Sequence, residues 1–185
     1  GSNAGSIGLN LTGAGATTDA VTNALSTTSF AGETYIYDST APVVTVTRVN
    51  GSVRAFPYAT NQSVTSIGGA CGLSAGDLAT GRPLIDGSAT TPATAACTAG
   101  SWNLTLATAL VAEGNWTLSA TQADSAGNTG AAPGQALSVD KARPTVTSIN
   151  RAGAAQAVNA GPLSWTVTFS EPVTAAAGAF TLECP

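Results

Sequence analysis

The stretch YDSTAPVVTVT, residues 37–47, returns 102 residues later as VDKARPTVTS, residues 139–148. Matching positions in the two copies are Asp38 and Asp140, Pro42 and Pro144, and Val44 and Val146. Each copy ends one β-rich run, inserts a proline that cannot donate to a sheet, and opens a new Val/Thr strand. A spacing of about 100 residues is that of a β-sandwich domain. The pattern therefore indicates domains of this kind in tandem.

The repeated pattern divides the 185 residues into three parts. Residues 41–140 span a complete period and predict one whole β-sandwich. We expect residues 1–38 to be the C-terminal part of a preceding domain and residues 141–185 to be the N-terminal part of a following one. The fold class predicted from this division is all-β, with tandem β-sandwiches, one complete and two partial.

Composition agrees with this fold class and excludes several functions. Only 9% of the residues are charged, and small and β-branched residues prevail, which suits strands joined by tight turns. Six Lys and Arg residues, in a chain of formal net charge −4, are too few for a basic stripe that binds nucleic acid. No apolar run is long enough to insert into a membrane, and any export signal would lie outside this sequence.

Three cysteines bear on the cellular compartment. Cys71 follows a strand-like run and Cys97 precedes another, so we expect a disulfide between them. The bond would stabilise the fold by roughly 3 kcal/mol, and it would persist only in an oxidising compartment. Two buried free thiols are the alternative, whereas a metal or redox site is disfavoured because histidine and C-x-x-C are absent. Cys184 remains outside the predicted pair, with a partner in its own domain or in another chain.

Strand alternation explains the tryptophans. Trp102, Leu104 and Leu106 share one face of a predicted strand, with polar residues on the opposite face. The same alternation surrounds Trp116 and Trp165, so all three tryptophans are predicted to lie in hydrophobic cores. A sugar-binding platform needs exposed aromatic rings, which makes a binding module of a secreted enzyme the weakest of the non-catalytic alternatives.

The complete domain ends in WTLSATQADSAGNTG, residues 116–130, followed by LSVD, residues 137–140. This run resembles the last hairpin of the bacterial Ig-like domains that are repeated in large surface adhesins. Residues 30–38 resemble the closing strand of a sister repeat, and residues 163–173 with 180–182 resemble its opening strands. The resemblance implies immunoglobulin-like β-sandwiches at the bacterial cell surface or outside the cell. Implied partners are neighbouring Ig-like domains, copies of the chain itself, or a surface ligand.

Acidic residues gather at the predicted joins between domains. Asp124 and Asn128 are four residues apart in one turn, Asp19 begins a turn of the same spacing, and Asp140 lies in a linker. The resemblance implies that Ca²⁺ can stiffen such joins, with Asp124, Asn128 and Asp140 as oxygen ligands. The alternative is an Asx turn in which Gly127 has a positive φ. We favour the turn and expect no cofactor, because calcium loops usually contain more carboxylates.

Catalysis has no support in the sequence. Histidine is absent, which removes the usual general base, and no serine-hydrolase, zinc-protease or P-loop motif occurs. The ten Asp and Glu residues fall mostly in turns and joins, where solvation explains them. We predict no catalytic residue and expect a protein that is not an enzyme.

Two structural functions remain. The first is a surface stalk or adhesin, in which these domains hold a distal binding head away from the cell. The second is a filament subunit, because Trp165 and Phe169 would lie exposed beside unpaired backbone in a partial domain. Leu9, Leu11 and Tyr35 belong to strands of the other partial domain. Strand addition between the two ends would join successive chains head to tail.

Overall fold

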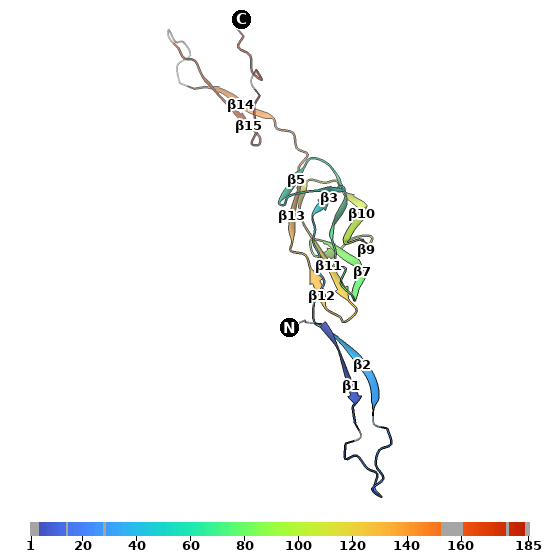
Figure 1. Ribbon diagram of the computed structural model, residues 1–185. Coiled ribbons are helices and arrows are strands. Elements are labelled where there is room, and N and C mark those ends of the chain that lie inside the picture. The colour runs from blue at the N-terminus through green and yellow to red at the C-terminus, as the bar shows by residue number, and fades with distance from the viewer. Residues whose placement is uncertain (1–3, 14, 28, 153–160, 177, 184–185) are drawn as a thin grey trace. The chain divides into compact units, whose positions relative to one another are not determined.

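The computed structural model describes residues 4–13, 15–27, 29–152, 161–176 and 178–183. Within these ranges the chain forms strands, turns and loops and no helix (Figure 1), so the predicted all-β fold class is confirmed. The chain divides into two compact units, Gly1–Asp140 and Lys141–Pro185, and each is treated by itself below. The described segments contain no helix long and apolar enough to cross a membrane.

The larger unit contains a β-sandwich of 11 strands. One layer holds β3 (Arg48–Val49), β4 (Ser52–Val53), β6 (Val64–Ala70) and β10 (Ser101–Leu110). The other layer holds β5 (Tyr58–Thr60), β7 (Asp77–Ile85), β8 (Ser88–Ala89), β11 (Gly114–Asp124), β12 (Thr129–Ala131) and β13 (Gln135–Val139). Strand β9 (Ala95–Thr98) pairs with both β10 and β7, so it joins the two layers at one edge. Strand β5 pairs with β13 in parallel, and the other pairings are antiparallel.

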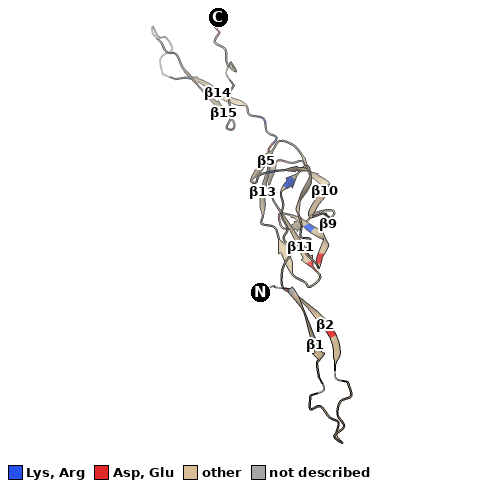
Figure 2. Cartoon of the chain, in the orientation of Figure 1, with Lys and Arg blue, Asp and Glu red and all other residues tan. Residues whose placement is uncertain are grey.

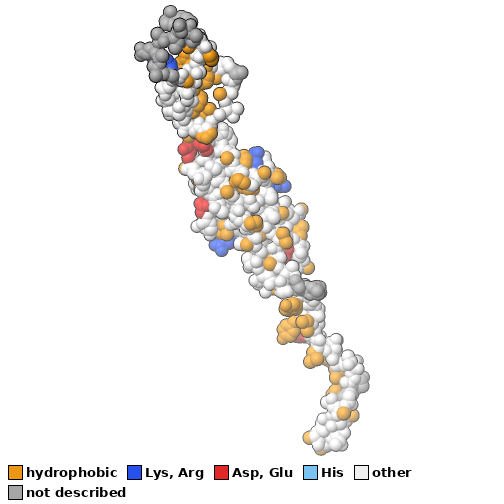
Figure 3. Space-filling model, turned by 90° about the vertical axis from the view of Figure 1, so that its left-hand side faces the viewer, with side chains coloured by type: hydrophobic (Ala, Val, Ile, Leu, Met, Phe, Trp, Pro, Cys, Tyr) orange, Lys and Arg blue, Asp and Glu red, His pale blue; other side chains and the backbone are white. Residues whose placement is uncertain are grey.

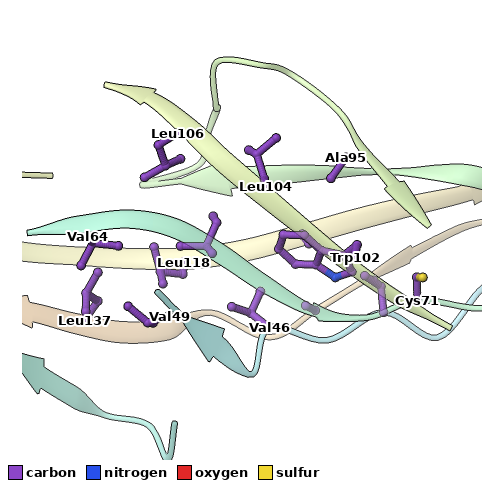
Figure 4. Close-up of a cluster of buried hydrophobic side chains, with 14 of the residues drawn as sticks. Val46, Val49, Val64, Cys71, Ala95, Trp102, Leu104, Leu106, Leu118 and Leu137 are labelled. Atoms are coloured by element: carbon purple, nitrogen blue, oxygen red, sulfur yellow. The ribbon is translucent and has the colours of Figure 1, made fainter. Parts of the chain in front are cut away.

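Strand alternation builds the hydrophobic core between the layers. In β10, Trp102, Leu104 and Leu106 are buried while Asn103 and Thr105 are exposed, as predicted. Figure 4 shows side chains from both layers meeting in this space. The core consists of Val44, Val46, Val49, Val64, Ile67, Cys71, Ala95, Trp102, Leu104, Leu106, Leu118, Ala120, Ala132, Leu137 and Val139.

The segment that opens the sandwich lies against β6. Residues 43–47, predicted as a strand, have no regular strand assignment, yet the Thr45 N–H donates to the Ala70 carbonyl at 3.0 Å. The indole N–H of Trp102 donates to the carbonyls of Thr45 and Ala70 at 3.0 and 3.1 Å. A Cβ at Gly69 would overlap the Thr45 carbonyl, so only glycine permits this close approach.

A two-stranded antiparallel sheet lies on each side of the sandwich in the sequence. Strands β1 (Ala4–Leu11) and β2 (Phe30–Asp38) form the first, within the larger unit. Strands β14 (Val146–Arg151) and β15 (Trp165–Phe169) form the second, within the smaller unit. Strand β2 coincides with the closing strand expected at 30–38, whereas residues 180–182 do not form the expected strand, since no neighbouring strand pairs with them.

The three tryptophans differ in burial, and Trp165 is exposed, as expected for its partial domain and not as expected from strand alternation alone. Trp102 is 2% exposed, and Trp116 is half-buried against the core. Trp165 is 44% exposed. Its sheet has two strands and no facing layer among the described residues of its unit. Alternation therefore directs the indole to one face without a second sheet to cover it.

Candidate functional site

The predicted Cys71–Cys97 disulfide is present in the structure. It connects the loop after β6 to β9, with a Cα–Cα distance of 6.1 Å, within the usual range for disulfides. The bond therefore ties the strand that joins the two layers to the first layer. A disulfide of this kind persists in oxidising compartments and fits a protein outside the cytoplasm. Cys184 lies outside the described residues.

Gln122, on β11 of the second layer, hydrogen-bonds to the loop that contains Cys71. Its Oε1 accepts from the Gly72 N–H at 2.7 Å, and its Nε2 donates to the carbonyls of Gly72 and Leu78 at 3.1 and 2.8 Å. The residue is 2% exposed, and these bonds satisfy its buried amide. Sequence reasoning missed this residue. The available signal was a polar residue at the position where the apolar alternation of Leu118 and Ala120 continues.

The turn after β11 binds the linker that precedes the sandwich. Asp124 Oδ1 accepts from the N–H groups of Ala126 and Asn128 at 2.9 and 2.8 Å, and its Oδ2 accepts from Asn128 Nδ2 at 2.8 Å. Asn128 Nδ2 also donates to the Asp38 carbonyl, at the end of β2, at 3.0 Å. The side-chain hydrogen bond from Asn128, helped by backbone N–H donors, lowers the pKa of Asp124 below its usual value. Asn128 thus connects the sandwich to the end of the preceding hairpin.

The turn between β1 and β2 has the same hydrogen bonds. Asp19 Oδ1 accepts from the N–H groups of Val21 and Asn23 at 3.0 and 2.9 Å, and Oδ2 accepts from Asn23 Nδ2 at 2.8 Å. The side-chain hydrogen bond from Asn23 is the main cause that lowers the pKa of Asp19. At the fourth position of the two turns, Gly127 has a φ of 95° and Thr22 has a φ of 72°. Positive φ is unfavourable for a β-branched residue.

Two of the calcium ligands considered from the sequence are engaged within their own turn. Asp124 and Asn128 bond to each other. Across the described ranges, no three His, Cys, Asp or Glu residues are grouped so as to hold a metal ion. N–H donors surround the Asp124 carboxylate, which is the environment of an Asx turn. Asp124 and Asn128 therefore do not fit a metal cofactor.

The β1–β2 hairpin has the register of the β11–β13 hairpin. Ile7 lies opposite Tyr35 as Trp116 lies opposite Leu137. Two residues further along the second strand, Tyr37 lies opposite Gly5, and Val139 lies opposite Gly114. Both first strands also lead into the Asp–Asn turns described above. The first hairpin of the chain is therefore equivalent to the last hairpin of the sandwich.

The β14–β15 hairpin has the register of the β3–β6 pair. Ile149 lies opposite Val167, as Val49 lies opposite Ile67. Each residue of the first pair is 100 positions after its equivalent in the second. The adjacent pairs, Ser148 with Thr168 and Arg48 with Gly68, keep the same offset. The last hairpin of the described chain is thus equivalent to the first pair of strands in the sandwich.

The N-terminal residues predicted for assembly differ in exposure and in their place in the β1–β2 hairpin. Tyr35 is 82% exposed and faces Ile7, a partner absent from the predicted set. Leu9 is 87% exposed and lies where the β1–β2 register shifts, while Leu11 is half-buried at the end of β1. Sequence reasoning chose these leucines for their apolar character, but only the pairing with β2 identifies Ile7.

The smaller unit contains an apolar hollow of about 480 Å³ beside β14–β15, lined mainly by Ile149, Trp165, Val167, Phe180 and Leu182. Trp165 belongs to this hollow, whereas the half-buried Phe169 packs edge-on against Phe180, with ring centroids 6.5 Å apart. Figure 3 shows hydrophobic side chains at the surface of this unit. Of the two residues predicted for assembly here, Trp165 therefore lines the hollow and Phe169 packs against Phe180.

Comparison with known proteins identifies the sandwich. Residues 74–141 match the bacterial Ig-like domain family. The matched segment contains β7 to β13, which includes the whole of β10 and the last hairpin. The resemblance seen in the sequence is thereby confirmed for this domain, and nothing in the match points to enzymatic activity. A search of curated proteins and a search of solved structures each found no match.

Proposed function

We propose, from the premise that residues 74–141 belong to a bacterial Ig-like domain, that the chain is a structural segment of an extracellular stalk or adhesin. Repetition is the observation that supports this proposal. An equivalent of the sandwich's last hairpin precedes the sandwich, and an equivalent of its first pair of strands follows it. Consecutive Ig-like domains present their elements in this order. The domains then space a distal binding surface away from the cell.

The cross-link and the joins suit a chain under tension. The Cys71–Cys97 bond spans a sequence separation of 26 and prevents the chain between these residues from extending. Asn128 bonds the turn of the sandwich to the Asp38 carbonyl at the join. The Asn128 bond restrains the join, which is where a pulled tandem array yields first, because joins have few buried contacts.

Labelling of intact cells tests the extracellular location. Antibodies against residues 41–140 are expected to bind unpermeabilised cells of the source bacterium. Alkylation of freshly lysed cells is expected to leave Cys71 and Cys97 unmodified, since both sulfurs are in the disulfide. Binding only after permeabilisation, together with two free thiols, would overturn the proposal.

Force spectroscopy tests the mechanical role. Reduction is expected to lengthen the fully extended chain by roughly 90 Å, because each of the released residues spans up to about 3.6 Å. The matched control is the double variant Cys71→Ser with Cys97→Ser, which has the full length with or without reductant. An unchanged length on reduction of the native chain would contradict the role of the bond as a limit on extension.

A second candidate function is a subunit of an extracellular filament. The observation that favours it is the exposure of apolar residues on both end hairpins, including Tyr35 and Ile149. Exposed apolar sheet faces are typical of surfaces that associate with another chain. In this function the partners are copies of the chain itself, and the sandwich is the body of each subunit.

A further inference from the structure

The triplet Asn-x-Ser/Thr is the acceptor for N-linked sugars in exported proteins. The sugar bonds to the asparagine amide nitrogen, and the hydroxyl residue two positions later is part of what the transferase recognises. An acceptor in a folded domain therefore needs an exposed asparagine, an amide without competing hydrogen bonds, and an exposed hydroxyl residue. Five such triplets occur in the chain, and they begin at Asn10, Asn50, Asn61, Asn103 and Asn115.

Hydrogen bonds engage the asparagine of two triplets. Asn50 Nδ2 donates to the Ser63 carbonyl at 2.9 Å, and its Oδ1 accepts from the Thr65 N–H at 2.8 Å. This amide thus holds the turn between β3 and β4 on the start of β6. Asn10 Oδ1 accepts from the Gly32 N–H at 3.1 Å. A sugar on Asn50 would break its bond to Ser63, and Asn10 is held by its bond to β2.

The triplet at Asn61 fails the third requirement. Asn61 is exposed in the loop between β5 and β6, and its Oδ1 accepts from Gln62 Nε2 at 2.9 Å. Ser63, the hydroxyl residue of this triplet, is half-buried. The hydroxyl is therefore less accessible to a transferase than those of the two remaining triplets.

The triplet at Asn103 meets all three requirements. Asn103 and Thr105 are both exposed on β10. Alternate residues of a strand share one face, so the amide and the hydroxyl are presented together, opposite the buried Trp102 and Leu104. Among the described residues, neither of the two exposed side chains forms a hydrogen bond.

A glycine leaves space beside Asn103. In the sheet, Asn103 lies opposite Gly68 of β6, and Arg48 of β3 lies opposite the other side of Gly68. A Cβ at Gly68 would lie 3.2 Å from Asn103 Oδ1, so a larger residue there would crowd the amide. Asn115, which is also exposed, lies opposite Ser138 and has a side chain beside it. Asn103 is therefore the better placed of the two.

The exposed face of β10 is polar but uncharged. Figure 2 shows this strand without Lys, Arg, Asp or Glu. Its exposed polar residues are Asn103, Thr105 and Thr108. Only 9% of the whole chain is charged, so hydroxyl and amide groups provide most of its hydration. A sugar at this position would add many hydroxyl groups to such a face.

We propose that Asn103 is an N-glycosylation site. The donor is a sugar activated as its diphosphate ester, and a transferase of the source bacterium catalyses the step. The amide nitrogen forms a bond to the anomeric carbon while the bond from that carbon to the phosphate oxygen breaks. The phosphate keeps the bonding electrons, and the amide proton passes to a base of the transferase. This inference rests on the extracellular location proposed above, because N-linked sugars occur on exported proteins.

Peptide mapping by mass spectrometry, on protein isolated from the source bacterium, tests the site. The peptide that contains Asn103 is expected to exceed its sequence mass by whole sugar residues and to release sugar ions on fragmentation. The peptide that contains Asn50 should have its sequence mass, so it is the internal control. An unmodified Asn103, or a sugar at Asn50, would overturn the proposal.

Substitutions at Thr105 separate recognition of the triplet from changes in folding. Thr105→Val keeps Asn103 and the branched shape of the side chain but lacks the hydroxyl, so the sugar is expected to be lost. Thr105→Ser is the matched control, because it keeps the hydroxyl and should keep the sugar. Near-ultraviolet circular dichroism of Trp102 reports that the sandwich is folded in both variants. Unchanged modification of Asn103 in Thr105→Val would overturn the proposal.

The outcome can be told apart from that of the stalk proposal. Cells labelled by antibody, with an unmodified Asn103, would retain the extracellular structural role and remove the glycosylation site. A sugar at Asn103, with no labelling of intact cells, would retain the site and remove the extracellular role.

Discussion

The β11–β13 and β1–β2 hairpins have the same register and the same Asp–Asn turn, yet one is buried and the other is exposed. Leu137 is 1% exposed, and its equivalent Tyr35 is 82% exposed. Strand pairing and turn hydrogen bonds therefore form in both settings. Strand pairing and turn hydrogen bonds thus do not depend on core packing. The stability that each side chain contributes does depend on it.

The largest expected effect contrasts the two equivalent positions. Leu137→Ala should lower the free energy of unfolding by about 2–5 kcal/mol, because it leaves a cavity in the core. Tyr35→Ala should change it by less than about 0.5 kcal/mol, since an exposed side chain loses little on truncation. Urea unfolding of the monomeric chain, followed by tryptophan fluorescence, measures both. Similar effects at the two positions would break the comparison.

Removal of the disulfide should affect the sandwich and leave the hairpin unchanged. The double variant Cys71→Ser with Cys97→Ser is expected to lose about 2–4 kcal/mol of unfolding free energy, because the unfolded chain regains its freedom. Amide chemical shifts of β1 and β2 should stay the same. Cys184→Ser serves as the control, and a comparable loss in that variant would argue against the assigned pair.

Exchange of the fourth residue between the turns gives the next effect. Gly127→Thr is expected to destabilise the sandwich by about 1–2 kcal/mol, because a β-branched residue resists left-handed backbone. Steric overlap with other residues is not the reason, since a Cβ at Gly127 meets nothing within 4 Å. Thr22→Gly should slow hydrogen exchange in β1 and β2 by relieving the same strain. Faster exchange in Thr22→Gly would show that Thr22 stabilises its turn by other means.

The pH dependence of the two turns gives a smaller effect. Hydrogen bonds from Asn128 lower the pKa of Asp124 in the folded state. The resulting stability is present above the unfolded pKa of about 3.9 and is lost as the pH falls through the lower folded value. Asp124→Asn should therefore reduce the acid sensitivity of the sandwich. Asp19→Asn, which alters the equivalent turn, should leave it unaltered. Acid titrations in urea compare the two, and equal sensitivity in both variants would contradict the assignment to Asp124.

Chelation should have the smallest effect of all. Because N–H donors occupy both oxygens of Asp124, removal of Ca²⁺ is expected to leave the melting temperature of the sandwich unchanged. Calorimetry with and without chelator provides the measurement. A fall in melting temperature would restore calcium as a ligand of the join.

Features that depend on neighbouring residues could be predicted from the sequence. Period-2 alternation located the buried face of β10, and the resemblance to a sister repeat indicated the closing strand at 30–38. The Asp–x–x–x–Asn spacing indicated the turn at Asp124, and the positions of Cys71 and Cys97 between strands indicated their bond. Each of these rests on geometry within a strand, within a turn or between strand ends.

Contacts between distant residues could not be predicted in this way. Asn128 reaches the Asp38 carbonyl across 90 positions of sequence, and Gln122 reaches Gly72 across 50. No local pattern distinguishes an amide with such a partner from an ordinary surface amide. The parallel pairing of β5 with β13 is equally invisible, because register between distant strands is set only when the layers close.

By itself, the sequence determined that this chain is all-β, where its tandem pattern repeats and which residues alternate along its strands. Alternation and turn formation need only nearby residues, so the same pattern produces the same hairpin wherever it occurs. The tertiary structure decided how fully each face is covered, since Trp102 is 2% exposed and Trp165 is 44% exposed although both follow the same alternation. Burial requires a second sheet across the core, and which faces receive one is a property of the assembled layers.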